Sequence, residues 1–400
     1  MFYLYNKSNM LAKRIANTQD IVKGLLITSV VFFHALMFMV LPNTGSVLTD
    51  FNILFALFPF LLMVFFFYAG YNYTPGKRTP VQNIKNRSVQ LLIPLASVFV
   101  LNTVLVFAIR LPTGESLEAL WNGIIYFFMS QPLAQMIGFP ANGVLNFDLV
   151  LGLGILWFLY ALYFVSIFFY LIVDYAIQKP SRLISIISIL LIAGFCLGQF
   201  VGTYLPYTCQ CYPVVLAIML LAAYLKQSRF LDKPVEKKKD LVLLIVNTLV
   251  AELIIVGIEL FGYFAFGATM VGSLPGGLYN SILKGFDAFL AFIVGFLGTY
   301  VIHTVSRGIG KIPVVSIVLD WYGRHSSFVY LLHPICLTFT HYVIFQQQIV
   351  LGDFQPFLYV FITIGFFVVA FLIMDLIRNK INASKQTKVD AGDVSDTKAD

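Results

Sequence analysis

Residues 18–41 read T-Q-D-I-V-K-G-L-L-I-T-S-V-V-F-F-H-A-L-M-F-M-V-L, and this stretch decides the class of the fold. From Ile21 onward it is apolar over about 20 residues, which is the length a helix needs to cross a bilayer. Lys23 and His34 interrupt it at positions about three helical turns, or roughly 16 Å of rise, apart. The two side chains therefore share one face of the predicted helix.

His34 has two interpretations at this stage. An ionisable side chain at membrane depth is costly, and it usually faces the bundle interior or a water-filled cavity. If solvent or substrate reaches it, His34 can act as a general base. The alternative is a neutral imidazole that is hydrogen-bonded to a neighbouring helix, with Lys23 extending to the lipid headgroups. The stretch by itself leaves both open.

The composition excludes a soluble globular protein. The 400 residues are 59% hydrophobic and 11% charged, whereas ordinary domains carry about 25% charged residues. The mean hydropathy is +0.87. A net charge of +7 could suit an anionic partner, but the basic residues lie in short loops between apolar runs and therefore indicate topology first. We expect membrane lipids as surroundings and no nucleic-acid partner.

The apolar runs predict an all-α, polytopic membrane bundle of about ten transmembrane helices in one domain, residues 1–378. Residues 379–400 are polar and lack periodicity, which predicts a disordered tail. The expected spans lie at about 21–41, 51–73, 90–110, 147–174, 183–204, 208–225, 241–264, 281–304, 321–345 and 356–377.

Lysine and arginine are distributed very unevenly between the two sides of this bundle. When the loops are numbered alternately, every Lys and Arg except Arg110 and Lys284 falls on one side. Cytoplasmic loops carry the excess of basic residues in multi-pass proteins. Both termini, and hence the tail, are therefore expected in the cytoplasm.

A second histidine, His333, is expected about two turns inside the ninth span and three residues after Tyr330, so these two share a face. His34 and His333 would form a proton-handling pair, or else two unrelated packing contacts. Sequence spacing does not decide between them. Neither histidine is accompanied by a His, Asp and Glu constellation at ligand spacing, so no metal site is predicted.

Basic residues cluster at the ends of the first three spans. Such a cluster suits a phosphate-bearing ligand, and arginine favours bidentate phosphate contacts. For most of the cluster, topology and attraction to anionic lipids are the favoured explanation. Arg87 is the exception, because it leads directly into an apolar span. The cluster contains Lys13, Arg14, Lys77, Arg78, Lys85 and Arg87.

Two glutamates offer a different function. Glu252 and Glu259 lie seven positions apart in the seventh span, which places them on one helical face, where they could line an ion path. His303, His325 and His341 lie near span ends, and no role is assigned to them.

A set of motifs along the chain resembles acyltransferase family 3, a family of integral-membrane proteins. In that family a basic residue, often arginine, precedes a histidine with ten residues between them, and Lys23 and His34 fit this spacing. The D-x-x-K-G variant resembles the branch with intercellular-adhesin membrane proteins and polysaccharide O-acetyltransferases. The other matching segments follow in order: 65–71 (F-F-F-Y-A-G-Y), Lys85-x-Arg87 before L-L-I-P, 156–159 (L-W-F-L) and 322–334 (Y-G-R-H-S-S-F-V-Y-L-L-H-P).

The resemblance implies transfer of an acyl group, usually acetyl, from acyl-CoA to a hydroxyl of a cell-surface glycan or lipid-linked sugar, in the bacterial cytoplasmic membrane. It implies that His34 is the catalytic base, with His333 beside it in the catalytic centre. Lys23 and Arg87 would hold the donor's phosphates or orient the site. The remaining substrate-binding candidates are Lys85, Trp157 and Tyr330. A lysine at position 23 can act only as a point charge, because it lacks the bidentate fork of arginine.

Two alternatives from other classes accompany this hypothesis. A polysaccharide exporter or flippase would use the same polar cavity for passage without covalent chemistry. An ion-coupled transporter would depend on Glu252 and Glu259.

Overall fold

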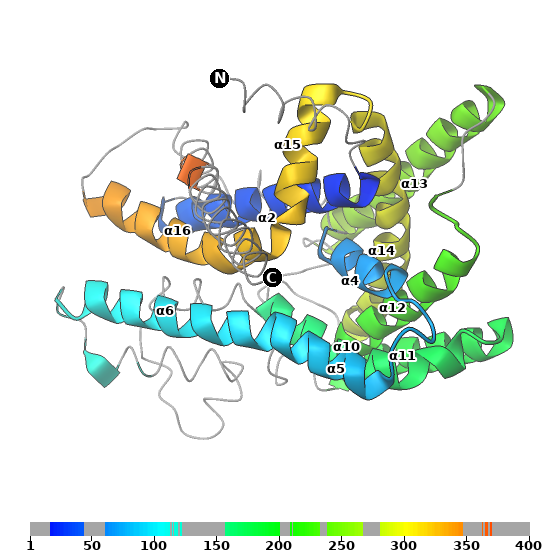
Figure 1. Cartoon of the computed structure of the whole chain (residues 1–400), viewed down its shortest axis with the longest axis horizontal. Coiled ribbons are helices and arrows are strands. Elements are labelled where there is room, and N and C mark those ends of the chain that lie inside the picture. The colour runs from blue at the N-terminus through cyan, green and yellow to red at the C-terminus, as the bar shows by residue number, and fades with distance from the viewer. Residues whose placement is uncertain are drawn as a thin grey trace, which may run out of the picture.

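The computed structural model describes residues 17–43, 61–112, 157–200, 211–232, 238–266 and 281–346, together with a few single positions. These residues form helices joined by turns, without strands, which confirms the all-α class (Figure 1). Five helices within them are long and apolar enough to cross a membrane: Pro80–Leu105, Phe158–Ala176, Pro180–Gly198, Lys238–Ile258 and Phe289–Ile309. The tenth predicted span, apart from four single positions, and the tail 379–400 lie outside the described residues.

The helices follow in chain order. They are α2 (Thr18–Asn43), α4 (Leu61–Tyr71), α5 (Pro80–Arg87), the π-helical turn η1 (Ser88–Leu92), α6 (Ile93–Arg110), α10 (Trp157–Ala176), α11 (Pro180–Phe200), α12 (Tyr212–Gln227), α13 (Lys238–Phe266), α14 (Ser281–Ile309), α15 (Pro313–Arg324) and α16 (Ser326–Gln346).

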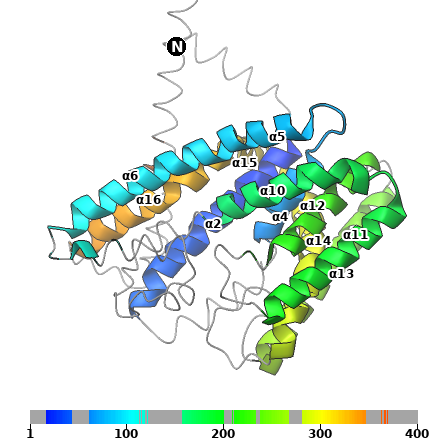
Figure 2. The same cartoon turned by 90° about the horizontal axis from the view of Figure 1, so that it is seen from below.

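Helix α2, the stretch that predicted the fold class, lies at the centre of this bundle. It packs against α4, α14, α15 and α16. Figure 1 shows α15 crossing α2, and Figure 2 shows α16 running between α2 and α6. Helices α10 to α14 form the other half of the molecule. The central position brings His34 next to α16, whereas Lys23 lies near the start of α2, where that helix meets α15.

Glycines allow the closest helix crossings. A Cβ atom on Gly24 of α2 would overlap the backbone of Leu319 in α15, and one on Gly323 of α15 would overlap the carbonyl of Asp20. Gly70 in α4 meets the backbone of Met219 in α12 in the same way. Small residues permit such close approach where apolar burial does not drive helices together in lipid. The K-G dipeptide at 23–24 therefore carries a packing requirement as well as a charge.

Aromatic side chains fill the core next to the second half of α2. Phe66 of α4 meets Phe158 of α10 edge-on at 4.7 Å between centroids. Phe158 in turn lies 5.4 Å from the ring of Tyr330 in α16. These three rings belong to one buried cluster that also contains Ile27 and Val31 of α2. The cluster fixes α16 relative to α2.

The predicted start of the ninth span was wrong. Residues 321–324 belong to α15, and α16 begins only at Ser326. The break falls at His325, whose Nδ1 lies 2.8 Å from the carbonyl oxygen of Trp321. Asp320 and Arg324 pair across one turn of α15 at 3.0 Å. An apolar count does not register this change of direction, because apolar residues continue on both sides of it.

Helix α5 continues into α6 through a π-helical turn, so the third span begins earlier than the predicted Q-L-L-I-P. Thr79 caps α5 in a capping box with Gln82, and Pro80 occupies the first turn. The turn Ser88–Leu92 ends two residues before Pro94, which lacks a backbone N–H. Such π-turns occur often at functional sites. This one follows Arg87 directly.

Candidate functional site

The two histidines expected inside the membrane meet. His333 Nε2 lies 3.1 Å from His34 Nδ1, and the rings stack with centroids 5.1 Å apart and planes inclined by 25°. His333 is fully buried, and His34 is partly buried. The contact joins α2 to α16, which are 299 positions apart in sequence. The interpretation of two unrelated packing contacts is therefore wrong.

The other nitrogen of His333 is held by the backbone of its own helix. Nδ1 lies 2.7 Å from the carbonyl oxygen of Tyr330 and 3.3 Å from that of Val329. The Tyr330 ring also packs on the His333 ring at 5.4 Å. Tyr330 is 5% exposed and lies between His333 and Phe158. It supports the histidine pair from behind, so its predicted contact with substrate gains no support.

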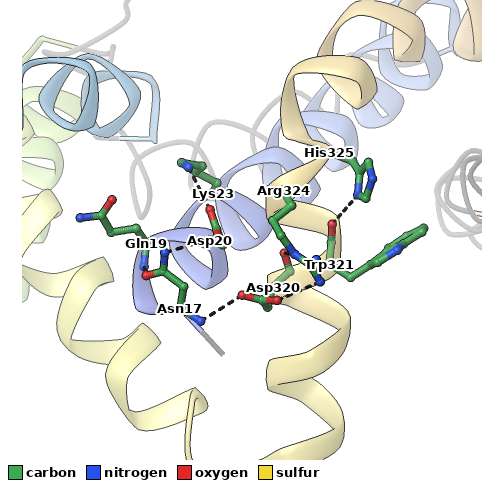
Figure 3. Close-up of polar contacts among 8 residues, drawn as sticks. All are labelled: Asn17, Gln19, Asp20, Lys23, Asp320, Trp321, Arg324 and His325. Carbon is green, nitrogen blue, oxygen red and sulfur yellow. Dashed lines mark hydrogen bonds and ion pairs between the residues drawn. The ribbon is translucent and has the colours of Figure 1, made fainter. Parts of the chain in front are cut away.

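Lys23 occupies the opposite end of the predicted polar face. Its Nζ lies 2.9 Å from Asp20 Oδ1, one turn earlier in α2, and 31% of its side chain is exposed. Asn17 N donates a 3.0 Å hydrogen bond to Asp320 Oδ1, which joins the start of α2 to α15 (Figure 3). Lys23 therefore belongs to a network that fixes the entry of α2 and remains open to solvent.

Arg87 lines a basic pocket of about 190 Å³. The pocket lies where the loop after α4 meets α5 and α10. Arg87 Nε is buried and has no hydrogen-bond partner within the described ranges. A buried donor without a partner is costly, and an anionic ligand would satisfy it. The lining contains three cations together with polar and aromatic groups: Ala69, Asn72, Tyr73, Thr74, Lys77, Arg78, Asn83, Arg87 and Tyr170.

The loop that carries Lys77 and Arg78 is held in place by Tyr73. Its hydroxyl donates to Asp174 Oδ1 of α10 at 2.7 Å, and its carbonyl accepts from Lys226 Nζ of α12 at 2.8 Å. Gly76 has φ = 71°, a left-handed conformation that glycine adopts without strain. The pocket is thus preformed.

The structure places none of the other sequence candidates at either site. Lys85 is exposed on α5 and does not line the basic pocket. Trp157 begins α10, but its side chain is outside the described set. Glu252 has a buried carboxylate oxygen without a described partner, and the Glu259 side chain is not described. No group of three or more His, Cys, Asp or Glu suited to a metal occurs among the described residues.

One polar cluster escaped the sequence analysis. His303, to which no role was assigned, is buried, and its Nδ1 lies 2.6 Å from the Tyr68 hydroxyl. Its Nε2 lies 4.0 Å from Asp232 Oδ1, and Tyr71 donates to Asp232 Oδ2 at 2.7 Å. The i, i+3 spacing of the two tyrosines was the only available signal. The cluster ties α4 to α14 and to the turn after α12.

The described residues form a helical bundle with five apolar candidate spans, a contact between two histidines inside it and a separate basic pocket. A family model described as an acyltransferase domain, that of acyltransferase family 3, matches residues 19–376. The chain therefore belongs to this family, and it is a membrane acyltransferase. No curated protein and no solved structure matches it.

Proposed function

We propose that this acyltransferase moves an acyl group, in the first instance acetyl, from acyl-CoA to a hydroxyl of a cell-surface or capsular glycan or its lipid-linked precursor. The contact between His34 and His333 carries the proposal. It brings a neutral base candidate into the protein interior, supported on one side by a second imidazole. Imidazole suits proton abstraction from a hydroxyl near pH 7.

The proposed reaction uses His34, the acceptor hydroxyl and the thioester of the donor. His34 takes the proton of the acceptor hydroxyl as its oxygen attacks the thioester carbonyl carbon. The carbon–sulfur bond then breaks, and the thiolate of CoA leaves. The proton passes from His34 to that sulfur. The products are the acylated sugar and free CoA, and His34 returns to its neutral state.

The basic pocket is the proposed site for the phosphates of the donor. Arg87 contributes a guanidinium whose Nε has no partner among the described residues, and Lys77 and Arg78 add charge to the lining. Helix α6 continues from Arg87 and packs against α16, the helix that carries His333. A donor anchored at the pocket would extend its flexible arm along these helices toward the histidine pair. Lys85 and Lys23 do not line this pocket, and their part in holding the donor stays a prediction.

The membrane orientation follows from charge. Every lysine and arginine except Arg110 and Lys284 lies on one side of the ten proposed spans, which supports a cytoplasmic location for the basic pocket and both termini in a bacterial cell. Acyl-CoA is present on that side. His34, about three turns deeper than Lys23, would then meet an acceptor that approaches from the opposite face.

Mass analysis of surface glycans from wild-type cells and cells without the chain tests the proposed function. An acyltransferase predicts glycan that persists after deletion but is lighter by one acyl group per modified sugar. That mass difference also identifies the acyl group. An exporter predicts that surface glycan disappears, and an ion-coupled transporter predicts glycan of unchanged mass; both results would contradict the proposal.

We expect Arg87→Gln to raise the KM for acyl-CoA by about 10- to 100-fold with a smaller effect on kcat. A hydrogen bond to a charged group contributes about 1.5–3 kcal/mol, and each 1.4 kcal/mol corresponds to a factor of ten. Initial rates in reconstituted vesicles, measured over a range of acyl-CoA concentrations, give both constants.

Arg182→Gln is the matched control for this variant. Arg182 lies over the Tyr175 ring at 4.5 Å and bonds Gln178, outside the basic pocket. It should leave the KM for acyl-CoA unchanged. Equal effects of the two substitutions would show a general dependence on surface charge and remove Arg87 from the donor site.

A further inference from the structure

The protonation state of the His333 ring follows from its neighbours. Both oxygens near Nδ1, those of Tyr330 and Val329, are backbone carbonyls. A carbonyl only accepts hydrogen bonds, so Nδ1 must carry the proton. In a neutral imidazole the other nitrogen is then an acceptor. Nε2 of His333 therefore presents a lone pair to His34.

Pro334 explains why the Tyr330 carbonyl accepts a hydrogen bond from a side chain. In an α-helix this oxygen would accept from the N–H four residues later, which is residue 334. Proline has no N–H, and Pro334 lies inside α16. The His333 ring nitrogen Nδ1 lies 2.7 Å from this oxygen and donates to it. The dipeptide His333-Pro334 thus removes the helical N–H donor and supplies a side-chain donor.

The proton positions on His34 follow from those on His333. Its Nδ1 faces the Nε2 lone pair of His333 at 3.1 Å and must donate the proton of that bond. The neutral His34 ring then has an unprotonated Nε2. Among the described residues, no hydrogen-bond partner occupies this nitrogen. The order of groups is Tyr330 carbonyl, His333 and His34, with each ring donating from Nδ1.

We propose that His333, through its hydrogen bond to the Tyr330 carbonyl, is a positioning residue that holds His34 in the Nδ1–H tautomer and makes Nε2 its basic atom. This inference rests on the proposed function, in which His34 is the base. Without the acceptor lone pair of His333, the His34 ring is free to protonate Nε2 and rotate. A ring in that state directs a proton, and no longer a lone pair, toward the acceptor hydroxyl.

The tautomers are measured directly by long-range ¹H–¹⁵N NMR of the full chain labelled at histidine and held in lipid nanodiscs. His34→Gln and His333→Gln each remove one set of signals and so assign the spectrum. We expect both histidines to carry the proton on Nδ1 in the wild-type protein. An Nε2–H form of His34 would overturn the inference. In the His333→Phe variant the His34 signals should change toward the Nε2–H form.

Kinetics of two His333 variants separate positioning from packing. Phenylalanine keeps a planar ring but removes donor and acceptor, and we expect it to lower kcat by at least about 10-fold while the KM for acyl-CoA stays unchanged. Glutamine retains one acceptor for His34 and one donor for the Tyr330 carbonyl, and it should restore part of the rate. Both variants must show wild-type thermal unfolding in detergent.

The outcomes distinguish this inference from the proposed function. If His333→Phe retains the wild-type rate, or His333→Gln is no faster than His333→Phe, His333 does not position His34. If the wild-type protein transfers no acyl group while the spectrum shows both Nδ1–H forms, the tautomer arrangement is correct and the proposed function is wrong. Transfer together with an Nε2–H form of His34 overturns only the inference.

Discussion

Replacing His34 by glutamine is expected to lower the rate of acyl transfer by about 10²- to 10⁴-fold, the usual contribution of a positioned general base. Glutamine preserves a donor to the Nε2 of His333, so the contact between α2 and α16 is retained. It cannot accept and release a proton near pH 7. The measurement is transfer from labelled acyl-CoA in reconstituted vesicles, at saturating donor.

His325→Gln is the matched control for this prediction. His325 lies at the junction of α15 and α16, and its Nδ1 contacts the Trp321 carbonyl, away from the histidine pair. It should transfer acyl groups at the wild-type rate. Transfer by His34→Gln within a few-fold of wild type would remove His34 as the base. An equal loss in both variants would point to folding instead of chemistry.

Gly323→Val is expected to give the largest loss of stability. Any Cβ at this position overlaps the Asp20 carbonyl and approaches the backbone nitrogen of Gly24. Backbone cannot move aside as a flexible side chain can, so α15 must separate from α2. Overpacking of a core costs about 1–3 kcal/mol even where side chains can adjust, and we expect a cost of at least this size. Size-exclusion chromatography of heated, fluorescently tagged protein in detergent measures it.

Gly257→Val makes the same chemical change where nothing opposes it. Gly257 lies in α13, and a Cβ there meets no atom within 4 Å. Its melting temperature should stay close to that of the wild-type protein. If Gly323→Val is equally stable, α2 and α15 do not cross as closely as the structure shows, and the network of Asp20, Lys23 and Asp320 would need another explanation.

The sequence located the histidines correctly but could not pair them. His34 and His333 stood out because ionisable groups are costly at membrane depth. A histidine within an apolar run can be recognised from the sequence alone. Their 3.1 Å contact joins helices on opposite halves of the chain. Lys23 shows the opposite case. Helical spacing placed it on the face of His34, but its partner is Asp20, three residues away.

Arg87 was singled out from its neighbours in the sequence alone. Its position at the entrance of an apolar span singled it out among six cations. The structure adds the neighbours of Arg87, because the loop held by Tyr73 brings Lys77 and Arg78 to the same pocket. Lys85, two residues earlier, faces solvent. A shift of two residues on a helix turns a side chain by about 200°, so adjacent basic residues have different surroundings.

The sequence by itself determined that this protein is an all-helical membrane acyltransferase and which ionisable residues lie inside it. Bilayer thickness and the cost of buried charge act on single segments, so a membrane span can be predicted from each apolar run by itself. Only the tertiary structure decided that α15 turns away from α16, that Gly24 and Gly323 let α2 and α15 cross, and that the two histidines meet. These features depend on contacts between segments far apart in the chain, and spacing within one segment carries no information about them.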